Sequence, residues 1–329
     1  MSNEFTKYIV NLVIIVISIL IILNLLSFYT SNYYNDKNIL LETKTSKLLR
    51  LGTLDTLPDV IFIGSSRTQN HIDTNSLSVN GISAYNFGLP GKHWDDHDIV
   101  IQKAVEYVNK AIVVSINAED LFRDVDCPFD PLIHRVFMDT FKECNVFSAI
   151  VPNIGNILEA ANKVYNKNLD GRKKTILEYY GVELDDLGNK INYIRGVKDR
   201  YVVFYQNGDS VVFSKRTSQH LKRDPDQQLT THNYLDKKFN NNAIKYMQYL
   251  EDIIIKSGKK ALFIIEPTSY NDTFLVDVSL LKKYIKSDIV DNTNFFFGDF
   301  NFWSDKKHLN YLGRGYYTSL IKRQLLDIL

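Results

Sequence analysis

The sequence predicts an α/β domain built on a doubly wound parallel sheet, with one transmembrane helix before it. Three observations predict this fold class: an uncharged apolar run near the N-terminus, short apolar runs that end in small, polar or turn residues, and amphipathic segments between them. Strands that alternate with helices form parallel sheets, and the active sites of such sheets lie at the carboxyl ends of the strands. With 329 residues, 45% of them hydrophobic, the chain is long enough to bury a substantial core.

The first element is the run over residues 9–28, which carries no charge and has about the 20 residues that a helix needs to cross a bilayer. A cleaved signal peptide is one alternative, but its apolar region is usually shorter and is followed by small residues, whereas the exit here reads SFYTSNYY. A buried core helix is the other alternative, although a helix that is apolar on every face suits lipid better. We expect a tail over residues 1–8, a transmembrane helix over 9–28 and a juxtamembrane stalk over 29–57 that contains the amphipathic run NILLETKTSKLL.

Residues 58–329 are expected to form the soluble domain. Its predicted strands are the apolar runs at residues 60–64, 82–88, 111–117 and 261–267. Its predicted helices cover residues 94–110, 242–260 and 312–329. Gly258 closes the second of these helices. Residues 118–240 interrupt the alternation, and we interpret them as an insertion over one edge of the sheet, with a hairpin at 200–214 that turns at Asn207 and Gly208.

Charge and cysteine content argue against several kinds of site. The chain has 39 basic and 38 acidic residues and no basic tail, so no long-range charge attracts nucleic acid. Cys127 and Cys144 can form one bridge outside the cytoplasm, but their spacing fits neither a metal site nor a disulfide framework. His93 and His97 stand beside several aspartates, which makes a divalent metal conceivable, but such acids more often complement a helix N-terminus. We therefore predict no metal and no cofactor.

The first predicted strand leads directly into Gly64, Ser65 and Ser66. A serine that follows a buried strand, next to a glycine that permits a sharp turn, lies where α/β enzymes expose a nucleophile. The alternative is that Ser66 only caps a helix N-terminus. Arg67 beside it can hold an anionic group of a substrate, or it can only cap and solvate the turn.

Asp305 and His308 stand near the C-terminus, just before the last predicted helix. At this spacing, on one helical turn or in a tight loop, the carboxylate can reach the imidazole. That contact fixes the tautomer of His308 and stabilises its imidazolium after it takes a proton from a serine. The alternative is a turn cap at Asp305 and an ordinary surface histidine at His308.

Together these motifs resemble the SGNH/GDSL hydrolase superfamily, whose fold is a flavodoxin-like three-layer α/β sandwich. Its first block, usually GDS, corresponds to the motif that ends at Ser66, here with serine in place of aspartate. The glycine of its second block falls on Gly91 in NFGLPG, and the asparagine of its third block, typically GGND, falls on Asn117 in VVSIN. Its last block, DxxH, falls on Asp305 and His308. The resemblance implies that the serine, the aspartate and the histidine are catalytic, with an oxyanion hole formed by Ser66, Gly91 and Asn117.

Gly91 and Asn117 also have physical reasons for the role that the resemblance implies. Proline fixes φ at one position of the turn LPG and glycine allows a positive φ at the next, so a type II turn can aim a backbone N–H into the site. Asn117 ends a predicted strand at the same edge, where its amide can donate to the same oxyanion. The alternatives are an ordinary turn at Gly91 and a strand-terminating cap at Asn117.

The GSSR form of the first block is similar to membrane-anchored SGNH proteins that modify bacterial surface polymers, among them the teichoic acid D-alanine transfer protein and the alginate O-acetyltransferases. This similarity implies an acyltransferase that acts on a cell-surface glycan with a membrane-bound O-acyltransferase partner. The domain is then expected on the periplasmic or extracellular side of the cell membrane, although lysine counts around residues 9–28 favour neither orientation. Two alternatives stay open: a stand-alone surface esterase for carbohydrate or lipid esters, and a catalytically silent SGNH-like binding subunit.

Overall fold

The structure is a computed structural model, and it describes most of the predicted soluble domain. The described residues are 54–89, 97–123, 191–197, 200–205, 210–214 and 228–329, with Asn11, Ile14, Ile15, Ser18, residues 47–48 and 51–52, Trp94, and residues 173–174 and 176–178. Most of the predicted transmembrane run 9–28 lies outside this set, as do Gly91, Cys127 and Cys144. Within the described residues, no helix is long and apolar enough to cross a membrane.

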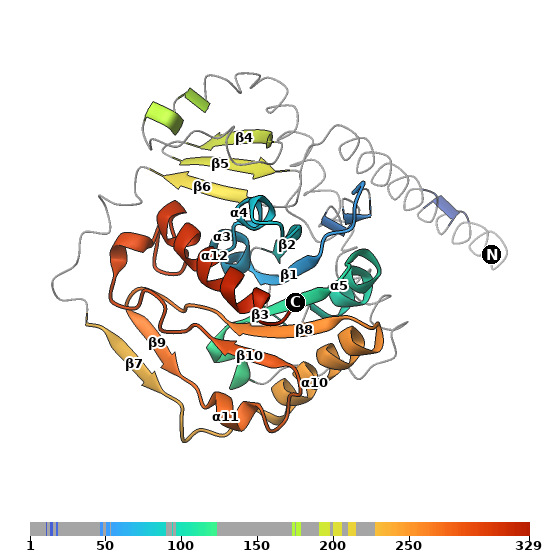
Figure 1. Ribbon diagram of the computed structural model, residues 1–329, viewed down its shortest axis with the longest axis vertical. Helices are drawn as coiled ribbons and strands as arrows, with labels where there is room; N and C mark the ends of the chain where they lie inside the picture. Colours follow the sequence, from blue (N-terminus) through green and yellow to red (C-terminus); the bar gives the residue numbers. More distant parts are fainter. Residues whose placement is uncertain are drawn as a thin grey trace, which may run out of the picture. The chain divides into compact units, whose positions relative to one another are not determined.

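A five-stranded parallel sheet forms the centre of the domain (Figure 1). Its strands are β1 (Val60–Ser65), β2 (Ala84–Leu89), β3 (Ala111–Ile116), β8 (Lys260–Ile265) and β10 (Asp288–Asp291). They lie in the order β2-β1-β3-β8-β10, and every neighbouring pair runs parallel. Counted along the chain within this sheet, the order is 2-1-3-4-5, which is an order of doubly wound sheets. The predicted α/β class with a parallel sheet is therefore confirmed.

The four predicted strands form β1, β2, β3 and β8, while β10 was absent from the sequence prediction. Only Ile289 and Val290 are apolar in β10, and an aspartate stands at each end. So short a run gives no clear period of hydrophobic residues. It becomes a strand because it pairs with β8 at the edge of the sheet.

Successive residues of the central strands face two separate cores. Ile61 and Ile63 of β1 belong to one buried cluster, whereas Val60 and Phe62 belong to another. This alternation is what the two-residue period of a strand produces when both faces of a sheet are covered. Each strand therefore stabilises helices on both faces.

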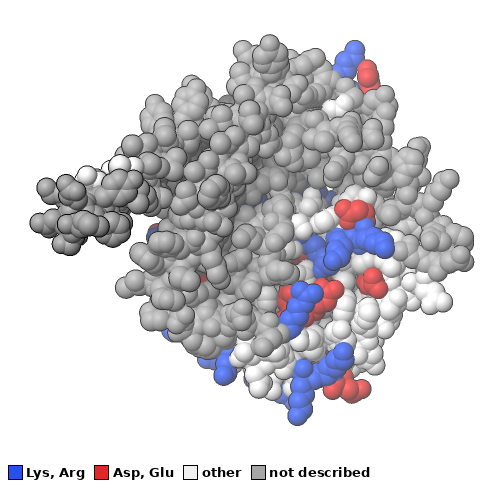
Figure 2. All heavy atoms as spheres, turned by 180° about the vertical axis from the view of Figure 1, so that it is seen from behind, with Lys and Arg blue, Asp and Glu red and all other residues white. Residues whose placement is uncertain are grey.

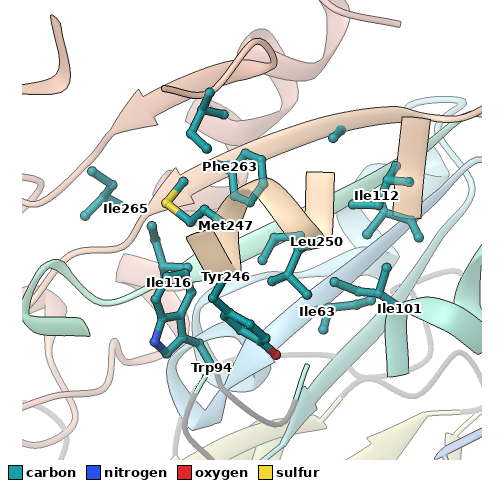
Figure 3. Packing of buried hydrophobic residues seen from close by; sticks show 14 of the residues in the cluster. Ile63, Trp94, Ile101, Ile112, Ile116, Tyr246, Met247, Leu250, Phe263 and Ile265 are labelled. Atoms are coloured by element: carbon teal, nitrogen blue, oxygen red, sulfur yellow. The ribbon is translucent and has the colours of Figure 1, made fainter. Parts of the chain in front are cut away.

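The helices lie on both faces of the sheet. The first core contains α5 (His97–Ala104) and α10 (Asn241–Lys256), and the second contains α4 (Thr74–Val79) and α12 (Tyr311–Leu326). Figure 3 shows part of the first core, where Met247 and Leu250 of α10 lie among Ile112 of β3 and Phe263 of β8. The fold is therefore a three-layer α/β arrangement.

The predicted long helices begin and end where their capping residues stand. The side chain of Asn240 accepts hydrogen bonds from the first turn of α10, and Gly258 follows the helix with a φ of 77°. Asn310 caps α12 in the same way, since its Oδ1 accepts from the Gly313 N–H at 2.9 Å. The predicted helices at 242–260 and 312–329 are confirmed with slightly different ends, and the one at 94–110 is shorter, because the 3-10 turn η2 (Val105–Tyr107) follows α5.

Among the residues that the structure describes, two small sheets accompany the central one. The first has the order β4-β5-β6 and consists of β4 (Ile191–Val197), β5 (Arg200–Tyr205) and β6 (Ser210–Ser214). Strands β5 and β6 are antiparallel, as the predicted hairpin requires. The second pairs β7 (Thr230–Asn233) with β9 (Asp272–Leu275) in parallel. The remaining short elements in the described part of the chain are α3 (Ser66–His71), η3 (Ala118–Leu121), α11 (Val278–Leu281) and η5 (Phe300–Phe302).

The end of the segment predicted as a stalk, residues 29–57, packs onto the domain. Leu51 is buried in the first core, and Lys47 is only 2% exposed. The Lys47 ammonium donates hydrogen bonds to the carbonyl oxygens of Asn86 at 3.0 Å and Gly88 at 2.8 Å. A lysine tolerates such burial because its apolar stem packs while its charge meets carbonyl dipoles. The folded unit therefore begins before residue 58.

Candidate active site

Ser66 lies at the carboxyl end of β1, as the first residue of α3. The cap of α3 is the preceding residue, since the Ser65 Oγ accepts a hydrogen bond from the Arg67 N–H at 3.2 Å. The alternative that Ser66 is itself the cap is therefore wrong. Because Ser65 takes the capping role, the Ser66 hydroxyl is directed elsewhere, and its Oγ lies 2.9 Å from the His308 Nε2.

Gly64 and Gly88 let α3 lie directly against the strands. A Cβ atom at Gly64 would stand 1.9 Å from the Thr68 Oγ1 and 2.9 Å from the Ser115 Cβ. A Cβ atom at Gly88 would stand 2.3 Å from the Gln69 backbone nitrogen. Gly64 is not among the described residues with a positive φ, so it is required for close approach and not, as the sequence argument held, for a sharp turn.

His308 and Asp305 share a tight loop just before α12. A β-bridge between Trp303 and Leu309 closes this loop, and the Asp305 Oδ1 accepts the backbone N–H groups of Lys307 at 2.8 Å and His308 at 2.9 Å. The His308 Nδ1 lies 2.9 Å from the Asp305 Oδ2. A carboxylate can only accept, so Nδ1 carries the hydrogen and Nε2 is left to accept the Ser66 hydroxyl hydrogen. The structure thus brings the three predicted catalytic residues into one hydrogen-bonded chain.

This loop is open to solvent. The Asp305 side chain is 59% exposed and the His308 side chain 26% exposed. Partial burial by itself raises the pKa of Asp305, but the hydrogen bond and charge of His308, together with the two backbone N–H donors, reverse this effect and leave the pKa below its usual value. Asp305 is therefore the charged partner that orients His308.

Asn117 follows β3, and both the oxygen and the nitrogen of its side-chain amide make hydrogen bonds. Its Oδ1 accepts a hydrogen bond from the Arg67 guanidinium, while its Nδ2 donates to the Asp120 Oδ2 at 2.7 Å. Arg67 is 5% exposed and Asp120 is 2% exposed, so the arrangement is buried. Burial raises the pKa of Asp120, and the hydrogen bonds from Asn117 oppose that shift. Arg67 thus links α3 to the end of β3, while Gly91, the other predicted donor, lies outside the described residues.

A second polar layer lies beneath the serine and was not predicted from the sequence. Glu266 directly follows β8, is 1% exposed, and accepts a hydrogen bond from the Thr68 Oγ1 at 2.7 Å. His71, at the end of α3, is fully buried, and its Nε2 lies 3.2 Å from the Lys307 carbonyl oxygen. The signal in the sequence was a carboxylate at the carboxyl end of a buried strand, in ALFIIEP, where a parallel sheet places its functional groups.

Glu266 is shielded from water, with only 1% of the residue exposed. Burial raises its pKa to about 7, although the hydrogen bond from Thr68 and the charge of Arg67 act in the opposite direction. Burial also lowers the pKa of His71 well below its usual value, helped by the charges of His308 and Arg67. Desolvation favours the neutral form of each group.

Charge on the outer surface is mixed. On the described part of the face drawn in Figure 2, basic and acidic side chains stand close to one another. The formal net charge of the chain is +1.

The metal site considered at His93 and His97 is only partly described. His97 is buried in α5, whereas His93 lies outside the described residues. Among the residues that the structure describes, no group of three or more His, Cys, Asp or Glu side chains is arranged to hold a metal ion. The acidic residue described in the first turn of α5 is Asp98.

The candidate site is thus a serine, histidine and aspartate chain at the carboxyl edge of a parallel sheet, supported by a buried polar layer. No protein-family model matches this chain, and no curated protein matches it either.

Proposed function

We propose that this protein transfers acyl groups through a covalent intermediate on Ser66, as a serine hydrolase or acyltransferase of the SGNH type. One observation carries the proposal: the Ser66 Oγ lies 2.9 Å from the His308 Nε2, and the His308 Nδ1 lies 2.9 Å from the Asp305 Oδ2. This is the relation of nucleophile, base and orienting carboxylate that serine-dependent acyl transfer requires. The doubly wound order of the sheet and the position of Ser66 at its carboxyl edge support the same interpretation.

The first half of the reaction forms the acyl-serine. The His308 Nε2 takes the proton of Ser66 as the Oγ forms a bond to the carbonyl carbon of an ester or thioester, and the carbonyl electron pair moves onto its oxygen. Backbone N–H groups of Ser66 and Gly91, with the amide of Asn117, are the proposed donors to that oxyanion. The intermediate collapses, the bond to the leaving group breaks, and the leaving group takes the proton from Nε2.

The second half regenerates the enzyme. A hydroxyl group gives its proton to the His308 Nε2 and its oxygen attacks the acyl carbon, after which Ser66 leaves and recovers the proton. If that hydroxyl belongs to water, the protein is an esterase. If it belongs to a sugar, the protein is an O-acyltransferase.

We favour transfer to a cell-surface glycan by a membrane-anchored enzyme, with a membrane-bound O-acyltransferase as the source of the acyl group. The uncharged run at residues 9–28 supports an anchor, and the GSSR motif supports the surface-polymer branch of the SGNH proteins. The domain is then expected outside the cytoplasmic membrane. The tests that follow distinguish this function from the two alternatives, a stand-alone esterase and a silent binding subunit.

The covalent step is tested by labelling the full chain, in detergent, with a fluorophosphonate that reacts with activated serines. We expect one adduct on Ser66, and no adduct in the Ser66→Ala and His308→Ala variants. Ser65→Ala is the matched control, because it removes the neighbouring hydroxyl and leaves the nucleophile in place. A folded wild-type protein that takes no label, or a Ser66→Ala variant that labels normally, would reject the proposal in favour of a silent domain.

The acceptor is tested with an aryl acetate as donor. A transferase is expected to release the aryl alcohol faster when oligosaccharides carrying free hydroxyls are added, and to place the acetyl group on them. Release that is unaffected by sugar, with acetate as the only product, identifies an esterase instead.

A further inference from the structure

Glu266 and His71 form a second carboxyl and imidazole pair directly beneath the first, and we call them the buried pair. The Glu266 Oε2 and the His71 Nδ1 are 3.9 Å apart, and both side chains are at most 1% exposed. The His71 ring lies 6.4 Å from the His308 ring, centroid to centroid, and it also makes T-shaped contacts with the rings of Trp303 and Tyr317. The acyl-transfer steps described above assign this pair no role.

The contacts of His71 define where its hydrogen is. Its Nε2 lies 3.2 Å from the Lys307 carbonyl oxygen, which can only accept, so Nε2 carries the hydrogen. Nδ1 makes no hydrogen bond, and the Glu266 Oε2 at 3.9 Å is too far away to accept one, so the Nδ1–H bond of an imidazolium to a carboxylate is not formed and Nδ1 presents its lone pair. A lone pair that faces a charged carboxylate is repelled, whereas one that faces a protonated carboxyl is attracted. The geometry thus favours a Glu266 that keeps its proton.

Each member of the buried pair also holds one half of the candidate active site. Glu266 binds Thr68, which lies on the same short helix as Ser66. His71 binds the carbonyl of Lys307, the residue before His308. The pair thus connects the helix that begins with the nucleophile to the loop that carries the base.

We propose that Glu266 and His71 act as a neutral pair that positions His308 against Ser66, and that the loss of the Glu266 proton adds a negative charge beneath the base. The proton concerned is the one on the Glu266 carboxyl, which faces the His71 Nδ1. Its release leaves a carboxylate and a neutral imidazole, so the net charge of the pair changes from zero to −1. This inference deepens the proposed function and, for its effect on catalysis, rests on it.

The groups around the pair are compatible with a neutral state. They come from each element packed against it: Arg67 and Thr68 of α3, Ser115 of β3, Asp305 and His308 of the loop before α12, and Tyr317 of α12. Burial has the largest effect on both members, and it raises the pKa of Glu266 to about 7 and lowers that of His71 well below 6.5. Release of the Glu266 proton therefore falls near neutral pH.

The proton count gives a test that does not depend on activity. Above the lowered pKa of His71 and below about pH 7 the folded pair holds its proton on Glu266, whereas between pH 4.5 and 6.5 the unfolded chain holds it on His71, because the ordinary pKa values are 4.5 for glutamate and 6.5 for histidine. Folding then changes the number of bound protons at this pair by zero. Stability should not depend on pH through the pair in this window.

When either member is removed, the stability of the fold should depend on pH through the member that remains. The two single variants should show pH slopes of opposite sign. In Glu266→Gln the unfolded chain binds one more proton than the folded one, so the unfolding equilibrium constant relative to wild type should fall about tenfold per unit of rising pH. In His71→Gln, which keeps an N–H donor for the Lys307 carbonyl, the folded chain binds one more proton. The unfolding equilibrium constant of this variant relative to wild type should then rise about tenfold per pH unit.

Urea unfolding of the full chain in detergent, between pH 4.5 and 6.5, measures these slopes. The double variant Glu266→Gln/His71→Gln is the matched control, and it should return the wild-type slope. If one single variant does not fold, the slope of the other decides alone. Slopes that equal the wild-type slope, or that share one sign, would overturn the proposal of a neutral pair.

A second measurement concerns His308 and uses the rate of Ser66 labelling by the fluorophosphonate. Glutamine imitates the protonated carboxyl, so Glu266→Gln should label at the wild-type rate at pH 5.5. At pH 8.5, where wild-type Glu266 is charged and stabilises the imidazolium that His308 becomes, the variant should label about tenfold more slowly. Equal rates at both pH values would overturn the effect on catalysis. If wild type takes no label at all, the proposed function fails, while the unfolding slopes still decide on the pair.

Discussion

The molecule contains the same two chemical groups, a carboxyl and an imidazole, in two different environments. Asp305 and His308 lie in a loop where the carboxylate is 59% exposed, and the pKa of Asp305 stays below its usual value. Glu266 and His71 lie under that loop without access to water, and the pKa of Glu266 rises to about 7. The comparison teaches that solvent access, more than the identity of the partner, determines which pair carries charge.

The largest expected effect is a loss of catalytic rate when the residues of the candidate active site are changed. Ser66→Ala and His308→Ala should each lower the labelling or turnover rate by at least about 10³-fold, because nucleophile and base act as one unit. Asp305→Asn should retain more activity, since it removes the charge that orients His308 but keeps the loop. The rates are compared at equal fractions of folded protein, measured by circular dichroism. An Asp305→Asn variant as inactive as Ser66→Ala would mean that the exposed carboxylate is as essential as the nucleophile.

The geometry of the exposed residues could be predicted from the sequence, whereas that of the buried pair could not. Asp305 and His308 are three residues apart, so local structure alone brings them together. Glu266 and Thr68 are 198 residues apart, and their hydrogen bond depends on the close approach of Thr68 to β1 and β3 that Gly64 permits. A sequence pattern reports local spacing and periodicity, but the burial of a single polar side chain depends on the finished packing.

The next largest effect is on the free energy of unfolding, and it tests the close packing of α3 at Gly64. Gly64→Ala should destabilise the domain by about 3 kcal/mol, because the new methyl group overlaps Thr68, the residue that donates to Glu266. Gly315→Ala is the matched control, since a Cβ atom there meets no atom within 4 Å and the residue lies inside α12. It should stabilise the domain by about 0.5–1 kcal/mol. Chemical unfolding measures both, and equal effects of the two changes would contradict the close approach of α3.

A smaller effect is expected where α3 begins. Ser65→Ala removes the hydroxyl that caps the helix and should cost about 1 kcal/mol of folding free energy. The Ser66 hydroxyl keeps its contact with His308, so labelling of the folded protein should stay within a few fold of wild type. Thermal unfolding and labelling are measured on the same sample. Loss of labelling in a stable Ser65→Ala variant would show that the two serines do not have separate roles.

The smallest effect concerns the stability that the exposed pair contributes. The folded pKa of Asp305 is lowered, so its contribution is present above the ordinary value of 3.8 and disappears as the pH falls through the lowered value. Because the carboxylate is mostly exposed, solvent screening limits this contribution to at most about 1 kcal/mol. Asp305→Asn should therefore be slightly less stable than wild type at pH 6, and the two curves should converge as the pH falls through the lowered pKa of Asp305. This trend is opposite in sign to that of Glu266 once His71 is removed, since a raised pKa stabilises the fold at low pH and a lowered one at high pH. Urea unfolding in the same buffers checks the contrast. Wild type compared with Asp305→Asn gives the contribution of Asp305, which should rise with pH, and His71→Gln compared with Glu266→Gln/His71→Gln gives that of Glu266, which should fall. Two contributions that change with pH in the same direction would remove the distinction between an exposed charged pair and a buried neutral one.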